Sequence, residues 1–301
     1  MFFVSILLLV KGSDILTDCA ATTAKIFGVS DFVIGVTIIA LGTSLPEFAS
    51  GVYASYLDRG EIVIGDILGA NIINVGLILG LTCLIKPLPI KHTEIYSGWI
   101  HLFILTMASI FLITGNGLSR IVGLIFFVAY LFYLWKVIRE YRTLGVEPVT
   151  RGPLVNNILG LLLGLSLILL GAKLLVNSII LLAQILGISA FTISLLLMPI
   201  GTSMPELTTT IITARKGYST MALGNIIGSN IANILLVLGI ASIVRPIHLH
   251  LQQILPAIIM MLLLGVLLIR FKRSKYTIER REGLIFLILY VVFVGMNIAY
   301  L

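Results

Sequence analysis

Apolar runs of about the length that crosses a bilayer recur along the whole chain, separated by short polar or charged turns. A membrane-spanning helix needs roughly 20 mostly apolar residues, and these runs are of that order. None of the turns is long enough to form a folded domain outside the membrane. The pattern predicts an all-α integral membrane protein with ten transmembrane helices, near residues 2–26, 33–56, 63–85, 96–114, 118–138, 154–186, 190–214, 220–244, 250–270 and 283–300.

A motif in the second apolar run recurs in the seventh, 159 residues later. Residues 42–47 read Gly-Thr-Ser-Leu-Pro-Glu, and residues 201–206 read Gly-Thr-Ser-Met-Pro-Glu. The same offset aligns a second set of residues, Gly65, Gly69, Asn71, Asn74, Gly80 and Pro87, with Gly224, Gly228, Asn230, Asn233, Gly239 and Pro246. Self-similarity in register over such a length indicates an internal duplication.

The duplication divides the chain at a charged linker that contains glycine and proline. We expect a first half over residues 1–140 with spans one to five, a cytoplasmic linker over 141–153, and a second half over 154–301 with spans six to ten. Because five is an odd number, the second half enters the membrane from the opposite side. The prediction is two inverted five-helix repeats with broken helices at the midplane, an architecture of many secondary transporters.

Composition supports a lipid environment. Hydrophobic residues make up 59% of the 301 and charged residues only 11%, with a mean hydropathy of +1.14. Soluble proteins average about 25% charged residues, so this chain could not cover a globular surface with so little charge. Two cysteines, Cys19 and Cys83, are too few for a disulfide framework or a multi-thiolate metal site.

The net charge of +7 does not indicate a nucleic-acid partner, because the basic residues follow the predicted topology. Nearly all of those in loops lie on one face of the membrane, and the exceptions are Arg59, Arg120 and Arg245. Cytoplasmic loops carry an excess of Lys and Arg. The distribution therefore predicts a multi-pass protein of the cell membrane, in contact with the lipid bilayer, with both termini outside the cytoplasm.

The duplicated motif places oxygen-bearing side chains inside two predicted spans. Positions i, i+3 and i+4 neighbour one another on a helix, so each copy presents three such side chains on one face. These are Thr43, Ser44 and Glu47 in the first copy, and Thr202, Ser203 and Glu206 in the second. Pro46 and Pro205 each remove a backbone donor and free a carbonyl four residues earlier. Carboxylate, hydroxyl and carbonyl oxygens together suit a hard cation.

An ionisable side chain in the middle of a membrane costs roughly 2.5–3.5 kcal/mol on insertion scales. The chain carries this cost twice, at the equivalent positions Glu47 and Glu206, which indicates a functional use. The structural alternative is a local hydrogen bond for each carboxyl, and Ser and Thr hydroxyls often bond back to their own helix. Asp66, whose counterpart is Asn225, lies near the end of its span, and we expect it to be wetted rather than a core ligand.

Spans three and eight add amide side chains to the same region. Asn71 and Asn74 share one helix face, and Asn230 and Asn233 repeat the pair. Their oxygens could ligate a cation, or their amides could cap broken helix ends. Glycines four residues apart in both spans permit close approach of neighbouring helices.

The paired motifs resemble the two α-repeats of the calcium/cation antiporter superfamily, and they look most like its prokaryotic sodium/calcium exchanger branch. The likeness extends over essentially the whole chain. Proton/calcium exchangers of the superfamily usually carry a Gly-Asn-Ala-x-Glu type of motif, which is absent here. The resemblance implies a ten-helix exchanger that extrudes Ca²⁺ using inward Na⁺. It also implies a set of metal-binding residues, with Glu47 and Glu206 at the centre, Thr43, Ser44, Thr202, Ser203, Ser229, Asn74 and Asn233 around them, and the backbone carbonyls of Ala40 and Pro199.

Two departures from the family pattern bear on the ions. Sodium/calcium exchangers often carry Asp at the position of Asn233, and the first repeat has Ala70 where the second has Ser229. The site then has two formal negative charges, which balance one Ca²⁺ or two monovalent ions. A third Na⁺ would have less to bind, and protons could replace Na⁺ because burial favours a neutral carboxyl group. A further departure is Pro199, which we expect to open its helix a turn earlier than in the first repeat.

The leading hypothesis is a Na⁺/Ca²⁺ antiporter that works by alternating access, with no enzymatic activity and no cofactor besides the transported Ca²⁺ and Na⁺, or H⁺. Exchange of Ca²⁺ for H⁺, or K⁺-assisted exchange, is the alternative within the class. A cation channel could use similar ligands but needs no inverted repeat. An intramembrane hydrolase would need a nucleophile–base pair or metal-binding histidines, and neither motif contains His or Cys.

Overall fold

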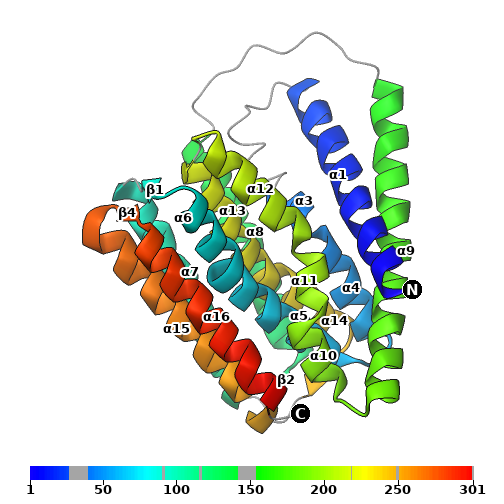
Figure 1. Ribbon diagram of the computed structural model, residues 1–301. Helices are drawn as coiled ribbons and strands as arrows, with labels where there is room; N and C mark the ends of the chain where they lie inside the picture. The colour runs from blue at the N-terminus through cyan, green and yellow to red at the C-terminus, as the bar shows by residue number, and fades with distance from the viewer. Residues whose placement is uncertain are drawn as a thin grey trace.

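The computed structural model describes residues 1–26, 40–89, 92–114, 117–141, 154–217, 219–248 and 251–299. Its secondary structure is almost entirely helical (Figure 1). The helices before the linker are α1 (Phe2–Ile26), α3 (Ala40–Thr43), α4 (Leu45–Tyr56), α5 (Gly60–Ile73), η2 (Asn74–Leu79), α6 (Gly80–Ile85), α7 (His92–Thr114) and α8 (Arg120–Tyr141). Those after it are α9 (Leu154–Leu186), α10 (Ala190–Leu196), α11 (Met198–Thr202), α12 (Met204–Arg215), α13 (Ser219–Ala232), η3 (Asn233–Val237), α14 (Leu238–Val244), α15 (Leu251–Lys275) and α16 (Arg280–Ala299). The predicted linker lies outside the described residues except for Tyr141.

Several helices are long and apolar enough to cross a membrane. Among the described residues these are Gly60–Ile85, Val155–Leu186, Ala222–Val244, Leu251–Lys272 and Arg280–Ala299. A further candidate is the pair Ala190–Thr202 and Met204–Arg215, which is bent by 45°. The chain is therefore a multi-pass membrane protein, as the apolar pattern predicts, while the number of ten spans stays a prediction.

Burial separates central helices from an outer set. The most apolar stretch of Gly60–Ile85 is 94% buried, whereas that of Arg280–Ala299 is 17% buried. The outer helices expose large apolar side chains, such as Leu159 on α9 and Val291 on α16. Apolar side chains both inside and outside are expected where lipid is the solvent. The central helices are thus shielded by protein, which is where polar groups at membrane depth can be tolerated.

Helices α1 and α9 lie side by side on one flank of the molecule, and α15 and α16 lie on the other (Figure 1). Glycines allow α1 and α9 to approach closely. A Cβ atom added to Gly12 would lie 2.8 Å from the Gly164 carbonyl oxygen, and one added to Gly164 would lie 2.8 Å from that of Gly12. Small residues permit this kind of backbone contact between membrane helices.

The two central helices lose their regular geometry at equivalent asparagines. Helix α5 passes into the π-helical turn η2 at Asn74, and α13 passes into η3 at Asn233. Neither turn follows from the apolar pattern, which is compatible with an unbroken α-helix at both places. Single π-helical turns inside α-helices are frequent at functional sites.

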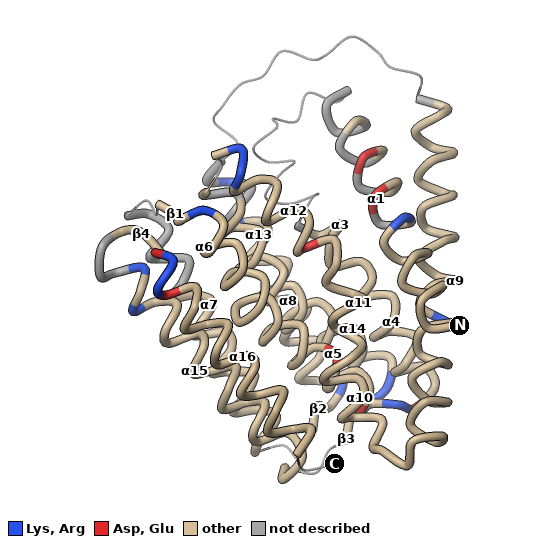
Figure 2. The backbone as a smooth tube through the Cα atoms, viewed as in Figure 1, with Lys and Arg blue, Asp and Glu red and all other residues tan. Residues whose placement is uncertain are grey.

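Two short antiparallel sheets, which the apolar pattern also does not predict, join helix ends. Strand β1 (Leu88–Pro89) pairs with β4 (Thr277–Ile278), and β2 (Gly117–Leu118) pairs with β3 (Ile247–His248). Figure 2 shows the two sheets at opposite ends of the molecule, with most of the Lys and Arg of the described residues near one end or the other. These ends are named the β1·β4 end and the β2·β3 end below.

Candidate cation site

Each copy of the duplicated motif lies at a helix break. The breaks fall at Ser44, between α3 and α4, and at Ser203, between α11 and α12. Pro46 and Pro205 occupy the first turn of the new helices, where a missing N–H leaves no intrahelical bond unmade. In the second copy a further break lies at Leu197, between α10 and α11 and two residues before Pro199. That Pro199 opens its helix earlier than in the first copy stays a prediction. The matching residues of the first copy lie outside the described ones.

The two glutamates follow these breaks and meet in the interior. Glu47 and Glu206 lie in the first turns of α4 and α12, where the positive end of a helix dipole favours negative charge. Both side chains are fully buried. Ser203 Oγ donates to Glu47 Oε1 over 2.9 Å, and Ser44 Oγ donates to Glu206 Oε1 over 3.1 Å. These reciprocal bonds bring two acids that are far apart in the sequence into one site.

The second oxygen of each acid is left for another partner. Among the described residues, no hydrogen bond reaches Glu47 Oε2 or Glu206 Oε2, and the same holds for Asn74 Oδ1 and Asn233 Oδ1. Buried polar atoms in proteins nearly always have a partner. A buried set of unpartnered carboxylate and amide oxygens fits a hard cation, which would bind them directly.

Other predicted residues lie beside this pair. Ser229 Oγ donates to Glu206 Oε1 over 3.3 Å. The Pro199 carbonyl accepts a hydrogen bond from the Ser203 backbone N–H over 3.0 Å, so one of its lone pairs is used within the helix break. Ala40 is the first residue of α3.

The threonines of the motif connect the breaks to the central helices. Thr202 Oγ1 donates to Asp66 Oδ1 on α5 over 3.3 Å, and it also interacts with Glu47. Its counterpart Thr43 Oγ1 donates to Asn225 Oδ1 on α13 over 3.4 Å. Each threonine therefore lies between the central acids and a second polar residue.

The expectation that Asp66 is wetted is wrong, because its side chain is fully buried. Helix α5 begins at Gly60, so Asp66 lies nearly two turns inside the helix rather than at its end. Its Oδ1 accepts the Thr202 hydroxyl, and its Oδ2 has no hydrogen-bond partner among the described residues. Asp66 is a third buried acid near the site.

Sequence reasoning missed His101 on α7. This side chain is buried, and its Nε2 lies 3.2 Å from Asn230 Nδ2. Asn230 Oδ1 in turn accepts from Asn74 Nδ2 over 2.8 Å. The bond to His101 therefore fixes which way the Asn230 amide faces, and through it the direction of Asn74 Oδ1. The only signal in the sequence is that an ionisable residue inside an apolar span is unusual.

The candidate donors described around Glu47 and Glu206 are oxygen atoms. Within the described ranges, no three His, Cys, Asp or Glu side chains converge on one point. The central site has two carboxylates with hydroxyl and amide oxygens around them. Such donors suit Ca²⁺, Na⁺ and similar hard cations, whereas transition metals favour imidazole and thiolate.

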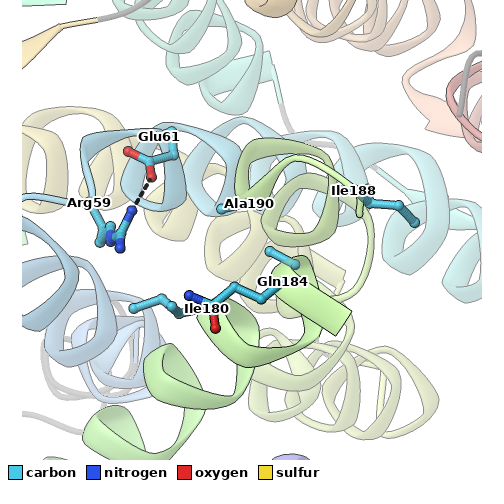
Figure 3. A pocket seen from close by; sticks show the side chains of 7 residues that line it. Arg59, Glu61, Ile180, Gln184, Ile188 and Ala190 are labelled. Atoms are coloured by element: carbon cyan, nitrogen blue, oxygen red, sulfur yellow. Dashed lines mark ion pairs between the residues drawn. The ribbon is translucent and has the colours of Figure 1, made fainter. Parts of the chain in front are cut away.

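A separate surface pocket of about 300 Å³ lies between the start of α5, the end of α9 and the start of α10. Its lining is formed by Arg59, Glu61, Ile180, Ala183, Gln184, Ile188 and Ala190 (Figure 3). Arg59 and Glu61 form an ion pair with 3.6 Å between nitrogen and oxygen. All these residues lie outside the duplicated motif, so the pocket is distinct from the buried site.

Buried acids held across two helix breaks in an all-helical membrane protein are typical of secondary transporters. The profile of the family described as sodium/calcium exchanger protein matches residues 1–139 and 156–299. The chain therefore belongs to the sodium/calcium exchanger family, and the resemblance to its prokaryotic branch is confirmed.

Relatives from archaea and bacteria align with most of the chain. The sodium/calcium exchanger MaX1 of Methanosarcina acetivorans is 33% identical, with 97% of this chain and 96% of that protein covered. Membrane protein MJ0091 of Methanocaldococcus jannaschii is 34% identical, with 97% and 95% covered. Inner membrane protein YrbG of Escherichia coli is 35% identical, with 82% and 79% covered.

Solved structures of the sodium–calcium exchanger NCX_Mj share the fold. One soaked with 10 mM Na⁺ and 10 mM Sr²⁺ superposes with a TM-score of 0.70 at 33% identity, over 98% of this chain and 96% of that chain. Another soaked with 2.5 mM Na⁺ and 0.1 mM Ca²⁺ gives a TM-score of 0.69 at the same identity and coverage.

Proposed function

We propose that this chain is a secondary active antiporter that exchanges Ca²⁺ for Na⁺ across the cell membrane by alternating access. The observation that carries the proposal is the reciprocal pair of serine–glutamate bonds, with one oxygen of Glu47 and one of Glu206 left unpartnered among the described residues. Two buried carboxylates balance the charge of one Ca²⁺. Membership of the family, and the likeness to the exchangers MaX1 and NCX_Mj, support Na⁺ as the counter-ion.

In this proposal Ca²⁺ binds between Glu47 and Glu206. Their unpartnered carboxylate oxygens and the amide oxygens of Asn74 and Asn233 are the first ligands, since all four groups are buried and available. The remaining ligands are Thr43, Ser44, Thr202, Ser203 and Ser229, with the backbone carbonyls of Ala40 and Pro199. The transported Ca²⁺ and Na⁺ are the only ions that this assignment requires.

We infer that the chain crosses the membrane ten times in two inverted halves, on either side of the linker. Strands β1 and β3 are counterparts at the repeat offset, and they lie at opposite ends of the molecule, as inversion requires. Contacts between glycines support the same correspondence between the two halves. Gly80 packs against Gly283, and the counterpart pair of Gly239 and Gly123 packs in the same way. Inverted halves allow two states of similar energy, each open to one side, which alternating access needs.

Charge placement supports an orientation. Lys86 lies beside β1, and Arg280 and Arg281 follow β4, whereas Arg120 and Arg245 lie at the β2·β3 end. With the positive-inside rule, the β1·β4 end is cytoplasmic and both termini are extracytoplasmic. Labelling of single cysteines introduced at the two ends, in intact cells, tests this orientation.

Ca²⁺-loaded proteoliposomes test the exchange itself. We expect external Na⁺ to drive Ca²⁺ release, and a pH gradient without Na⁺ to drive none. Release driven by the pH gradient alone would assign Ca²⁺/H⁺ exchange, and a requirement for K⁺ in addition to Na⁺ would assign K⁺-assisted exchange. Ca²⁺ current that needs no counter-ion would assign a channel and contradict the proposal.

A further inference from the structure

A third buried carboxyl group lies next to the proposed Ca²⁺ site. Asp66 on α5 is fully buried, its Oδ1 accepts from Thr202 Oγ1 over 3.3 Å, and its Oδ2 has no hydrogen-bond partner among the described residues. The ion pairs formed toward the same end of the molecule use other acids, Glu61 and Asp58. Within the described part of the chain, therefore, no basic side chain forms a salt bridge with Asp66.

Asp66 is close to the central acids without being one of them. Thr202 lies between Asp66 and the central acids, because it donates to Asp66 and also interacts with Glu47. Along α5, Asp66 lies eight residues before Asn74, or about 12 Å toward the β2·β3 end at the rise of an α-helix. Among the described residues no three acidic, His or Cys side chains converge on one point, and we therefore treat Asp66 as a second position beside the two glutamates.

The equivalent position on α13 indicates what packing alone requires. Asn225 Oδ1 accepts from Thr43 Oγ1 over 3.4 Å, and Asn225 Nδ2 donates to Thr210 Oγ1 over 3.1 Å. A neutral amide thus makes the same contact with a motif threonine and has a partner for both of its polar atoms. The aspartate at position 66 adds a negative charge that this contact does not need.

The surroundings of Asp66 are closely packed. A Cβ atom added to Gly65 would lie 2.7 Å from the Phe191 carbonyl oxygen on α10, and one added to Gly69 would clash with the Leu195 carbonyl oxygen on the same helix. Helix α5 therefore contacts the backbone of α10 on both sides of Asp66 in the sequence. An ionised carboxylate in such a place is stable only with a compensating charge, which a bound cation would supply.

We propose that Asp66 binds a monovalent cation beside the Ca²⁺ site, with Thr202 as a ligand shared by the two positions. The cation is Na⁺, and in this respect the site rests on the function proposed above. Carboxylate and hydroxyl oxygens suit a small hard cation, and one negative charge balances one Na⁺. Asp66 therefore adds one bound Na⁺ to those that the two glutamates balance, and the charge of this additional Na⁺ contributes to the current during exchange.

The test compares Asp66→Asn with the wild type and with Glu61→Gln in proteoliposomes. D66N installs the amide found at Asn225, which keeps the size of the side chain and its contact with Thr202 but removes the charge. E61Q removes an acid from the same helix at a partly exposed position, and we expect it to behave as the wild type. D66N should raise the Na⁺ concentration for half-maximal Ca²⁺ release by roughly tenfold and lower the Na⁺-driven current. Ca²⁺–Ca²⁺ exchange without Na⁺ should keep its wild-type rate.

Two results would overturn this site. An unchanged Na⁺ dependence and current in D66N would make Asp66 a neutral hydrogen-bonding group. Loss of Ca²⁺–Ca²⁺ exchange in D66N protein that is folded by gel filtration would make Asp66 part of the Ca²⁺ site. Should D66N fail to fold, Asp66→Ser makes the same comparison with a hydroxyl and no charge. A wild type without Na⁺-driven Ca²⁺ release would instead contradict the proposed function, so the two failures are distinguishable.

Discussion

The site has two halves, one around Glu47 and one around Glu206. Their backbones follow the same course, but some of their side chains differ. In both halves a serine at a helix break donates to the acid of the other half, and an asparagine begins a π-helical turn. The halves differ where Asp66 corresponds to Asn225 and where Ala70 corresponds to Ser229. The shared backbone course brings the two acids together, whereas the differences set where charge and hydrogen-bond donors are placed.

These differences give the two acids unequal surroundings. Glu206 Oε1 accepts hydrogen bonds from both Ser44 and Ser229. Glu47 Oε1 accepts from Ser203, and the alanine that corresponds to Ser229 has no hydroxyl to offer. The half that contains Asp66 therefore has more negative charge, and the other half has more donors. Proteins with duplicated halves can keep a symmetric backbone and still bind ions asymmetrically.

The largest expected effect comes from removing either central acid. Glu47→Gln and Glu206→Gln should each abolish Na⁺-driven Ca²⁺ release and weaken Ca²⁺ binding more than about 100-fold, since breaking a buried charge pair costs about 3–5 kcal/mol. Calorimetric titration with Ca²⁺ measures the binding, and gel filtration verifies the fold. Normal exchange by both variants would refute the site.

A smaller effect is expected from adding an acid to the second half. Asn233→Asp should tighten cation binding by roughly tenfold and increase the number of monovalent ions exchanged per Ca²⁺. The measurements are Ca²⁺ affinity and the ratio of Na⁺ to Ca²⁺ flux. Asn156→Asp, at an exposed position of α9, is the control for added charge. If affinity and ratio stay unchanged in N233D, position 233 is not a ligand.

Exchanging the small residues at positions 70 and 229 tests the difference in hydrogen bonding. Ser229→Ala removes a donor to Glu206, and we expect Ca²⁺ affinity to fall about fivefold, the equivalent of about 1 kcal/mol for one hydrogen bond. Ala70→Ser should change affinity less and in the opposite direction, because the added hydroxyl has no established partner. Equal affinities for S229A and the wild type would show that the bond does not matter for binding.

The smallest effect is expected from removing His101, which contacts Asn230 and through it orients Asn74. Asn230 interacts with His101, whereas its counterpart Asn71 donates to the Ile67 carbonyl of its own helix over 2.7 Å. His101→Leu should lower Ca²⁺ affinity about threefold, within the range of a neutral hydrogen bond. His101→Gln, which keeps an acceptor, should restore most of the loss. If H101L binds Ca²⁺ as the wild type does, Asn74 is oriented by packing alone.

Much of the site could be predicted from the sequence, because the relevant features are local. Pro46 and Pro205 mark the helix starts, and their neighbours carry the oxygens. The expectation that Asp66 is wetted failed for a local reason. The span was predicted to begin at residue 63, but α5 begins at Gly60, so Asp66 lies inside the helix rather than near its end. His101 could not be assigned at all, since nothing in its own span points to Asn230.

By itself, the sequence indicated a multi-pass membrane protein, the two helix breaks at the duplicated motif and the oxygen-bearing side chains that stand at those breaks. Each of these depends on residues that are neighbours along the chain. Only the tertiary structure decided that Ser203 meets Glu47, that Thr202 meets Asp66 and that Asn230 meets His101. Such partners belong to helices that are distant in the sequence, and burial of the oxygens between them arises only when those helices pack.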